Sequence, residues 1–326
     1  MKRLFATLAT GTLLSGALMT TTANAQDDWP NRPVRVISTF AAGGTADILA
    51  RIVAEQLSIA FKQQFFVEVR AGAGGQIGVK AIVDSPDLYT IGIANISHLV
   101  LHPMSRPDLG YDPKKDLANI AFVAGSPVLL SVNPKSGIKT LKEFVERGRK
   151  DSLSYSSSGL GSMGHLVALN FISMSNVKAE HVPYKGASQA LADLVGSHIV
   201  WSSQTVSSTA SYVRAKTLDG LAVSTAQRMP DWPDLPTFKE QGYDLQASIW
   251  FGISGPAAMP PALVKKINEE IKRGLAKPEI ADRMRRDGMV VDPMTPEQFA
   301  AFIDKETQVW APVMKAAGLT AEKDKK

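Results

Sequence analysis

Cysteine is missing altogether from the 326-residue sequence. Disulfides therefore cannot hold the fold together, although an exported protein would meet conditions that permit them. For the same reason we expect no lipid anchor on an N-terminal cysteine. A chain of this length buries enough apolar surface to fold without such cross-links.

A strong charge of one sign is also lacking, since 36 lysine and arginine residues stand against 31 aspartate and glutamate residues. The sequence has no basic stripe interleaved with aromatic residues, which is the pattern typical of nucleic-acid-binding surfaces. We therefore expect no nucleic acid among the partners of this protein. Its length suggests two domains.

Long apolar runs are absent beyond the N-terminus, where one apolar stretch begins after Lys2 and Arg3 and extends to about Met19. The stretch is followed by Ala23-Asn24-Ala25. A basic start, an apolar middle and an A-x-A exit are typical of a cleavable secretory signal peptide. Polar residues interrupt the stretch, which is short for a membrane span, so an uncleaved anchor is the weaker alternative. We expect residues 1–25 to be removed and the mature protein to be soluble and periplasmic.

Strand-like and helix-like segments alternate along most of the remaining chain. The pattern predicts strands at residues 34–40, 66–69, 90–94, 120–124, 128–132, 153–156, 181–182, 199–201, 218–224 and 249–254. It predicts helices at residues 45–57, 140–150, 263–275 and 279–286, one ending near 84, and others beginning near 162 and 295. Such alternation indicates an α/β fold with mostly parallel sheets flanked by helices.

Three loops rich in glycine or serine follow predicted strands, at residues 41–45, 72–75 and 156–162. Ligands of open α/β sheets bind at the carboxyl ends of strands. Glycine lets a ligand approach the backbone, and the helix N-terminus that follows favours an anion. One such loop alone would be an ordinary β–α turn, but three together predict an anion-binding cleft.

The chain resembles the Bug receptors, the periplasmic solute-binding components of tripartite tricarboxylate transporters. The resemblance extends from Trp29 to about Gly318. It rests on eight motifs in a fixed order, which are Trp29-Pro30-Asn31-Arg32-Pro33, Phe40-Ala41-Ala42-Gly43-Gly44-Thr45-Ala46-Asp47, Arg70-Ala71-Gly72-Ala73-Gly74-Gly75, Tyr111-Asp112-Pro113, Tyr155-Ser156-Ser157-Ser158-Gly159, Val182-Pro183-Tyr184-Lys185-Gly186, Leu221-Ala222-Val223-Ser224 and Leu235-Pro236-Thr237-Phe238-Lys239-Glu240-Gln241-Gly242.

The resemblance implies a two-domain periplasmic binding protein, type II-like, with a ligand cleft between the domains. We expect domain 1 to comprise residues 26–125 and 248–326, and domain 2 residues 126–247. The two crossings would form a hinge that closes on the ligand. A monomeric, non-catalytic receptor without a cofactor or bound metal is implied, working with inner-membrane permease subunits.

The implied ligand is a small organic carboxylate, namely a dicarboxylate, a tricarboxylate or an aromatic dicarboxylate such as terephthalate. The family grips a carboxylate mainly through backbone N–H groups and bridging waters. The loop pattern and the resemblance together select the expected ligand-binding residues, which are Phe40, Ala41, Ala42, Gly43, Gly44, Thr45, Asp47, Gly74, Gly75, Ser97, His98, Ser157, Ser158, Gly161, Ser162, His165, Tyr184, Lys185, Gly186 and Ser203.

Three positions depart from the family pattern. Ala42 replaces a proline, and Leu88 replaces a glycine between Asp87 and Tyr89. A cleft-facing acidic residue of the family is also missing from the segment Trp201-Ser202-Ser203-Gln204. Because an ammonium group would need that acid, an amino-acid ligand is disfavoured.

An exported enzyme, either a hydrolase or an NAD-linked oxidoreductase, is the rival class. The segment from Gly159 to Gly164 reads G-x-G-x-x-G, and Glu180 lies 21 residues after Gly159. That acid would begin the next strand, whereas the ribose-binding acid of a dinucleotide site ends it. Ser162 lacks the glycine two positions earlier that a nucleophile elbow requires, and no oriented aspartate accompanies His165.

His98 and His102 are four residues apart, a spacing that a metal pair can have. No further ligand pattern supports a metal, so both remain candidates for lining the cleft. Trp250 and Phe251 remain either hinge and core aromatics or stacking residues. A receptor that serves a signalling system in place of a transporter is a further alternative.

Overall fold

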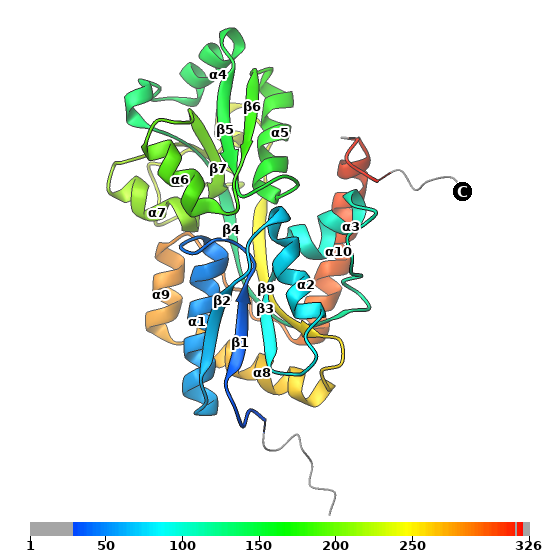
Figure 1. Ribbon diagram of the computed structural model, residues 1–326. Helices are drawn as coiled ribbons and strands as arrows, with labels where there is room; N and C mark the ends of the chain where they lie inside the picture. Colours follow the sequence, from blue (N-terminus) through cyan, green and yellow to red (C-terminus); the bar gives the residue numbers. More distant parts are fainter. Residues whose placement is uncertain (1–28, 317, 322–326) are drawn as a thin grey trace, which may run out of the picture.

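The computed structural model describes residues 29–316 and 318–321, which form two α/β lobes stacked end to end (Figure 1). The predicted signal peptide and its cleavage site lie outside the described residues. No helix in the described ranges combines the length and the apolar character that a membrane crossing needs.

Lobe 1, the lower lobe in Figure 1, is built on strands β1, β2, β3, β9 and the first part of β4. Its elements are β1 Val34–Ser38, α1 Thr45–Phe61, β2 Phe65–Val69, α2 Gln76–Val83, β3 Thr90–Asn95, a π-helical turn Ser97–Leu101, α3 His102–Ser105, β4 Leu117–Val132, β9 Ser248–Pro256, α8 Pro261–Leu275, α9 Pro278–Arg286 and α10 Pro296–Ala316.

Lobe 2, the upper lobe, contains the second part of β4 and the chain between β4 and β9. Its elements are α4 Leu141–Lys150, β5 Leu153–Ser157, α5 Met163–Ser175, β6 Ala179–Pro183, α6 Ala187–Val195, β7 Trp201–Thr205, α7 Val206–Arg214 and β8 Asp219–Val223.

Two long strands connect the lobes. Strand β4 pairs with β9 as far as Pro127, which lies opposite Ser248, and then pairs with β7 from Val128, which lies opposite Thr205. The separate strands predicted at 120–124 and 128–132 were therefore wrong, because β4 is continuous through both. Proline lacks a backbone donor, and Pro127 falls where β4 changes partners, so it does not end the strand.

The predicted fold class is confirmed, with one refinement of the sheets. The outer strands pair in parallel, as β1 does with β2 and β3 and as β5 does with β6 and β7. The connecting strands β4 and β9 are antiparallel to their neighbours, so each sheet is mixed. The domain boundaries at residues 125 and 247 remain a proposal, which the change of partners after Pro127 supports.

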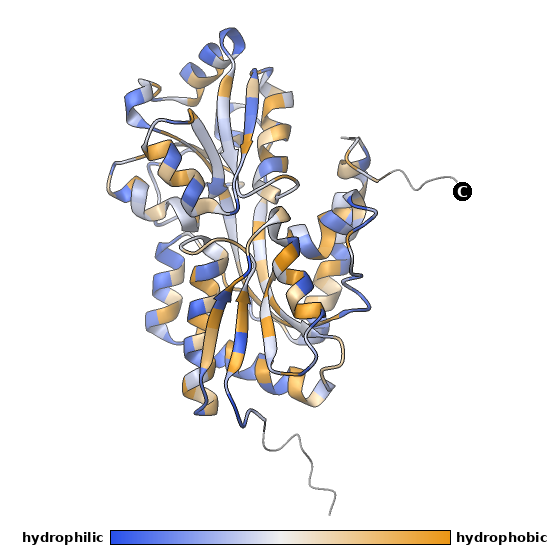
Figure 2. Cartoon of the chain, in the orientation of Figure 1, coloured by the Kyte–Doolittle hydropathy of each residue, from blue (hydrophilic) through white to orange (hydrophobic). Residues whose placement is uncertain are grey.

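Burial follows the amphipathic pattern of each helix. In α1 the residues Leu49, Ile52, Val53 and Leu57 face the sheet and are buried, and Figure 2 shows this apolar side turned inward. Helix α4 begins with a capping box in which Thr140 and Glu143 satisfy each other's backbone N–H groups. These local signals explain why both helices were predicted correctly.

Three helical segments were not predicted, namely the turn and helix at 97–105, helix α6 and helix α7. In the first and the last of these, four of nine residues are serine, threonine or histidine, which are weaker helix formers than alanine or leucine. The strand predicted at 199–201 is also displaced, since β7 covers Trp201–Thr205. Its buried hydroxyl groups pair across the sheet, as Ser202 does with Ser156 at 2.9 Å, so polar residues form a strand there.

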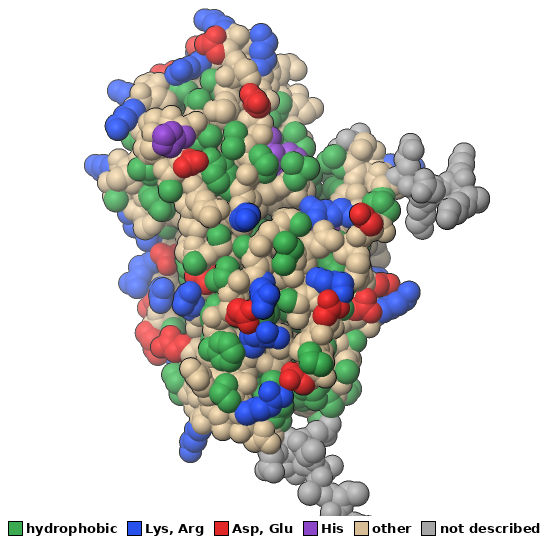
Figure 3. All heavy atoms as spheres, viewed as in Figure 1, with side chains coloured by type: hydrophobic (Ala, Val, Ile, Leu, Met, Phe, Trp, Pro, Cys, Tyr) green, Lys and Arg blue, Asp and Glu red, His purple; other side chains and the backbone are tan. Residues whose placement is uncertain are grey.

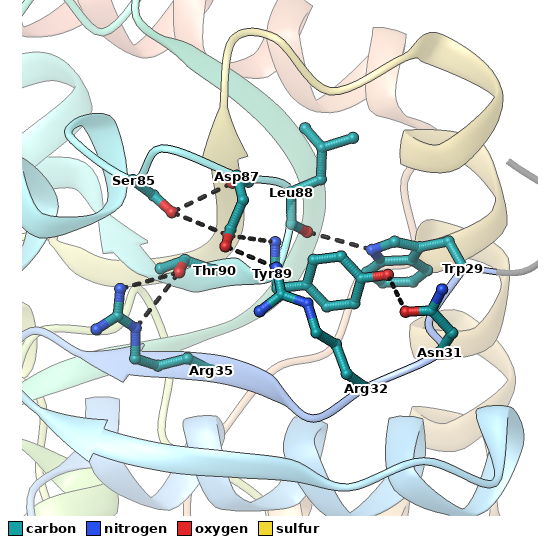
Figure 4. A network of polar contacts seen from close by, with 9 residues as sticks. All are labelled: Trp29, Asn31, Arg32, Arg35, Ser85, Asp87, Leu88, Tyr89 and Thr90. Carbon is teal, nitrogen blue, oxygen red and sulfur yellow. Dashed lines mark hydrogen bonds and ion pairs between the residues drawn. The ribbon is translucent and has the colours of Figure 1, made fainter. Parts of the chain in front are cut away.

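The motif that begins at Trp29 fixes the start of the described chain to the loop before β3 (Figure 4). Arg32 forms an ion pair with Asp87 at 2.8 Å and lies over the ring of Tyr89. The hydroxyl of Tyr89 donates to Asn31 at 2.8 Å, and the indole of Trp29 donates to the Leu88 carbonyl. This network precedes β1 and β3, at the ends of the strands opposite the three predicted loops.

Candidate functional site

A narrow cavity lies between the lobes, at the carboxyl ends of β1, β3, β5 and β7. Its free volume is about 30 Å³, which is room for a water molecule but not for an organic acid. On the face shown in Figure 3 the lobes meet without a wide opening. Fifteen residues line the cavity, namely Phe40, Gly44, Thr45, Ala46, Asn95, Ser97, Ser158, Ser162, Met163, Gly164, Ala187, Gln204, Thr205, Ile249 and Phe251.

Four helices begin at this wall. The first residues of α1, α5 and α6, and Thr205 immediately before α7, all line the cavity. Helix N-termini carry free N–H groups and a partial positive charge. Their convergence from both lobes produces an electrostatic environment that suits an anion.

Charged side chains are absent from the cavity wall among the described residues. Its polar groups are the hydroxyls of serine and threonine and the amides of Asn95 and Gln204. The apolar part includes Phe40, Ile249 and Phe251. An anion placed here would be bound by neutral donors and helix ends, without an ion pair.

Six of the predicted site residues lie on the wall, and they are Phe40, Gly44, Thr45, Ser97, Ser158 and Ser162. The other fourteen predicted residues do not line the cavity, and their contacts are described below. The set of ligand-binding residues therefore remains a prediction, and these six are the members of it that line the cavity.

The loop before α1 holds the lobes together through its backbone. The amide of Ala41 donates to the Lys185 carbonyl at 3.2 Å, and the Ser188 hydroxyl donates to the Ala42 carbonyl. Buried Asp47 accepts a hydrogen bond from the Gly43 amide at 2.9 Å and pairs with Arg51. Asp47 thus positions the loop and does not reach the cavity.

Glycine is required in this loop at one of its two positions. Gly43 has φ of 81°, in the left-handed region, whereas Gly44 has φ of −83°. A Cβ at Gly44 would meet the Ala41 carbonyl oxygen at 3.5 Å and the Ala187 Cβ of lobe 2 at 3.7 Å, which are ordinary van der Waals distances. Neither the backbone conformation nor these contacts therefore require glycine at Gly44.

Gly74 forms a second contact between the lobes, and the adjacent Gly75 packs on His98 of its own lobe. A Cβ on Gly75 would lie 2.0 Å from Nε2 of His98, and a Cβ on Gly159 of lobe 2 would lie 3.3 Å from Cα of Gly74. His98 is fully buried and accepts from the Asn95 amide through Nδ1 at 3.1 Å. Its Nε2 then donates to the Gly74 carbonyl at 3.0 Å, so His98 supports this loop from behind.

His165 and Ser157 lie behind the wall of lobe 2. The ring of His165 stacks on that of His181, with 4.1 Å between centroids. Ser157 is fully buried and contacts Nε2 of His181 at 2.7 Å. Burial, and then repulsion from His165, lowers the pKa of His181 to about 4, so both rings are neutral at neutral pH.

The remaining predicted residues contact other parts of the protein. Tyr184 donates to Asp193, and burial raises its pKa to about 12. The side chain of Lys185 is exposed, and Gly186 packs against Ala41. Gly161 lies beside Arg106 and His102, while Ser203 donates to the Gly164 carbonyl at 2.8 Å.

Nine wall residues were not among the predicted ones, and they are Ala46, Asn95, Met163, Gly164, Ala187, Gln204, Thr205, Ile249 and Phe251. Asn95 and Thr205 are the last residues of β3 and β7. The rule that ligands bind at strand ends could have found them, but these ends carry no glycine-rich loop.

The enzyme alternatives find no support in the local geometry. The hydroxyl of Ser162 caps α5 by accepting from the His165 amide at 3.3 Å. Nδ1 of His165 accepts from the Gly161 amide, so it does not act as a base toward Ser162. His98 and His102 are neighbours, but within the described ranges no group of three potential ligands could hold a metal.

A larger hollow of about 590 Å³ lies elsewhere, between α5, the loop before β9 and the end of α10. Leu166, Trp310 and Met314 give it a mainly apolar lining. It contains none of the predicted residues, and of the four helices that begin at the smaller cavity only α5 contributes to its lining. The smaller cavity is therefore the candidate site.

The sequence model of a family described as tripartite tricarboxylate transporter family receptor matches residues 49–319. Protein BugT of Bordetella pertussis is 30% identical over 297 residues, which cover 90% of this chain and 91% of BugT. Among solved structures, an R. palustris protein with adipate is 30% identical with a TM-score of 0.86, covering 90% of this chain and 99% of that one. MatC of Rhodopseudomonas palustris with bound malate is 26% identical with a TM-score of 0.82, covering 87% and 99%.

Proposed function

The chain belongs to the tripartite tricarboxylate transporter receptor family, and from this premise we propose that it captures a small organic carboxylate for a transporter of that type. The ligand would be a dicarboxylate, a tricarboxylate or an aromatic dicarboxylate such as terephthalate. Permease subunits of the inner membrane would then receive the ligand from the closed, monomeric receptor.

The observation that supports this function best is the convergence of four helix N-termini on a cavity without charged side chains among the described residues. A helix N-terminus stabilises a nearby anion by about 0.3–1 kcal/mol at an exposed site, and by up to about 2 kcal/mol when partly buried. The N–H groups at the starts of α1 and α6 can donate to carboxylate oxygens. At the start of α5 the Met163 amide already donates to Ser97 at 3.1 Å and the His165 amide to Ser162 at 3.3 Å, so the Gly164 amide is the donor that α5 can offer. Phe40 and Phe251 on the wall provide apolar contact for the carbon skeleton.

Ligand entry requires motion of the lobes, since the cavity has about 30 Å³ of free volume. We propose that β4 and β9, which cross between the lobes, act as the hinge. The closed form brings the loop at Ala41 against Lys185, and a permease could recognise this combined surface.

The neighbours solved with adipate and with malate support a dicarboxylate in particular. Both compounds carry two carboxylates on a short carbon chain. An amino acid is less suitable, because the described part of the wall offers no carboxylate to pair with an ammonium group.

A thermal-shift screen of the mature protein tests the proposal, using adipate, malate, citrate, terephthalate and aspartate as probes. A ligand that binds the native state alone raises stability by RT ln(1 + [L]/Kd), about 2.7 kcal/mol at 100 times Kd. We expect at least one di- or tricarboxylate to raise Tm, and calorimetry to show saturable binding without turnover. If no carboxylate binds, or if the protein converts one chemically, the proposal is wrong.

A further inference from the structure

Gln204 presents an unused hydrogen-bond donor to the candidate site. It is the fourth residue of β7, is 2% exposed and lines the cavity. The Ser158 hydroxyl donates to its Oε1 at 2.7 Å. Its Nε2 is buried without a hydrogen-bond partner among the described residues. An unpaired buried amide costs about 1–3 kcal/mol, so such a group calls for a partner.

The orientation of Gln204 is fixed within lobe 2 alone. Its backbone pairs with Leu129 of β4, and Ser158 lies in the loop before α5. Neither contact crosses to lobe 1, so the amide keeps its orientation whether the lobes are open or closed. A donor oriented in advance binds a ligand group with little further ordering cost.

We infer that Nε2 of Gln204 donates to an acceptor oxygen at the second end of the ligand, and that Gln204 thereby selects dicarboxylates over monocarboxylates and over ligands with an ammonium group at that end. This inference rests on the proposed function. In this arrangement the helix N-termini bind one carboxylate of the ligand, and Gln204 forms a hydrogen bond with the group at the ligand's other end.

The chemistry of the wall supports this selectivity. With Oε1 accepting from Ser158, the part of this wall amide left without a partner among the described residues is its donor, Nε2. A methyl group there would leave the donor unpaired. An ammonium group would meet a second donor and, within the described residues, no carboxylate. A carboxylate oxygen satisfies the amide and gains a charge-assisted hydrogen bond.

Pairs of ligands that differ at one end provide the test. They are adipate with hexanoate, malate with 3-hydroxybutanoate, and terephthalate with 4-methylbenzoate, in each of which a methyl group replaces one carboxylate. The pair whose diacid binds the wild type most tightly is then measured on Gln204→Met, Gln204→Glu and Gln56→Met. Calorimetry serves for tight ligands and competition for weak ones.

We expect Gln204→Met to weaken diacid binding about 10-fold to 100-fold, as for the loss of a hydrogen bond to a charged group. Monoacid binding should change little, which also shows that the variant is folded. Gln204→Glu should weaken the diacid further, because two carboxylates would then face each other. Gln56→Met replaces another buried glutamine with an unpaired atom, away from the cavity, and should preserve both affinities.

Two results would overturn the inference while leaving the proposed function intact. One is a diacid-to-monoacid preference in Gln204→Met equal to that of the wild type. The other is full diacid affinity in Gln204→Glu, which would mean that the amide is rotated and presents its oxygen. A wild type that binds no carboxylate would instead overturn the proposed function itself.

Discussion

The guanidinium of Arg106 connects the two lobes by donating to the Leu160 carbonyl of lobe 2 at 2.9 Å. A second nitrogen of the same group donates to the Ala73 carbonyl of lobe 1, also at 2.9 Å. Arg106 follows α3, and its side chain is half-buried. It does not line the cavity, so it acts on the closed form without contacting the ligand.

Replacing Arg106 with methionine should therefore weaken ligand binding by shifting the protein toward the open form. Apparent affinity falls in proportion to the closed fraction. Loss of one partly exposed hydrogen bond between the lobes, at about 1 kcal/mol, predicts about a fivefold increase in Kd. Calorimetry on Arg106→Met measures this, with Arg273→Met as the control because Arg273 pairs with Glu270 on the surface of α8. Unchanged affinity in Arg106→Met would show that the contact does not stabilise closure.

A side chain added at Gly186 would clash with lobe 1 when the lobes are closed. Its φ of 167° is extended and open to any residue, but a Cβ would lie 2.8 Å from both Cβ and N of Ala41. Gly186→Ala should leave each lobe folded and prevent full closure, raising Kd about 10-fold or more if closure is made about 1.4 kcal/mol less favourable. Thermal unfolding of the free protein checks the fold, and calorimetry checks the affinity.

Lys185→Met is the matched control for that variant. The Lys185 side chain is exposed and its carbonyl makes the contact with Ala41, so the substitution removes a charge and preserves the contact. Affinity should stay within about threefold of the wild type, as surface substitutions usually change free energies by less than about 0.5 kcal/mol. Equal losses in both variants would indicate that the Lys185 charge binds the ligand.

Two buried histidines predict how stability depends on pH. Burial lowers the pKa of His98 to about 3, and burial with repulsion from His98 and Arg106 lowers that of His102 to about 2. Unfolded histidine titrates near 6.5, so the neutral folded form is favoured above that pH. As pH falls below 6.5, the unfolded state binds protons that the folded state does not, and stability is lost. Each histidine lowers the free energy of unfolding by up to about 1.4 kcal/mol per pH unit.

His102→Leu should reduce this pH dependence. Neither ring nitrogen of His102 has a hydrogen-bond partner among the described residues, so leucine removes an uncompensated polar group. Denaturant unfolding at pH 6.5 and pH 5 should show a smaller loss of stability in His102→Leu than in the wild type. Carboxylates with lowered pKa, such as Asp87, stay ionised in this window and do not obscure the difference. An equal loss in both proteins would contradict the assignment.

The sequence predicted the loops that meet at the boundary between the lobes better than it predicted the wall of the cavity. Glycine and serine loops indicated Gly44, Ser158 and Ser162, which line the cavity. His98 was selected with the same loops but lies behind Gly75, where a Cβ would be 2.0 Å from its ring. Spacing along the chain does not reveal on which side of a loop a side chain packs.

Gln204 illustrates a different limit. The sequence drew attention to its segment because an acidic residue of the family is missing there. The strand was nevertheless predicted at 199–201, whereas β7 covers Trp201–Thr205 and includes Gln204. The side chain of Gln204 accepts a hydrogen bond from Ser158, 46 residues away, and its backbone pairs with Leu129. Such long-range pairings determine both the strand and the unused donor, and hydrophobic periodicity does not report them.

The absence of cysteine makes closure directly testable, because two introduced thiols would have no competitors. A Cβ on Gly43 would lie 3.5 Å from Cβ of Ser188, across the boundary between the lobes. Disulfides have Cβ separations of about 3.5–4.5 Å, so the variant Gly43→Cys with Ser188→Cys should form a bond in the closed state. The positive φ of Gly43 makes the cysteine somewhat strained, at a cost of about 1–3 kcal/mol.

Oxidation of this double variant without ligand should hold the lobes closed around a cavity of about 30 Å³. Binding of the best ligand should then be abolished and should return when a reductant opens the bond. Oxidation after ligand is added should instead trap the ligand through gel filtration. The single variants Gly43→Cys and Ser188→Cys control for strain and for loss of the Ser188 hydroxyl. If the oxidised, ligand-free double variant binds ligand as well as its reduced form does, entry does not require the lobes to separate at this loop, and the hinge between β4 and β9 is not what admits the ligand.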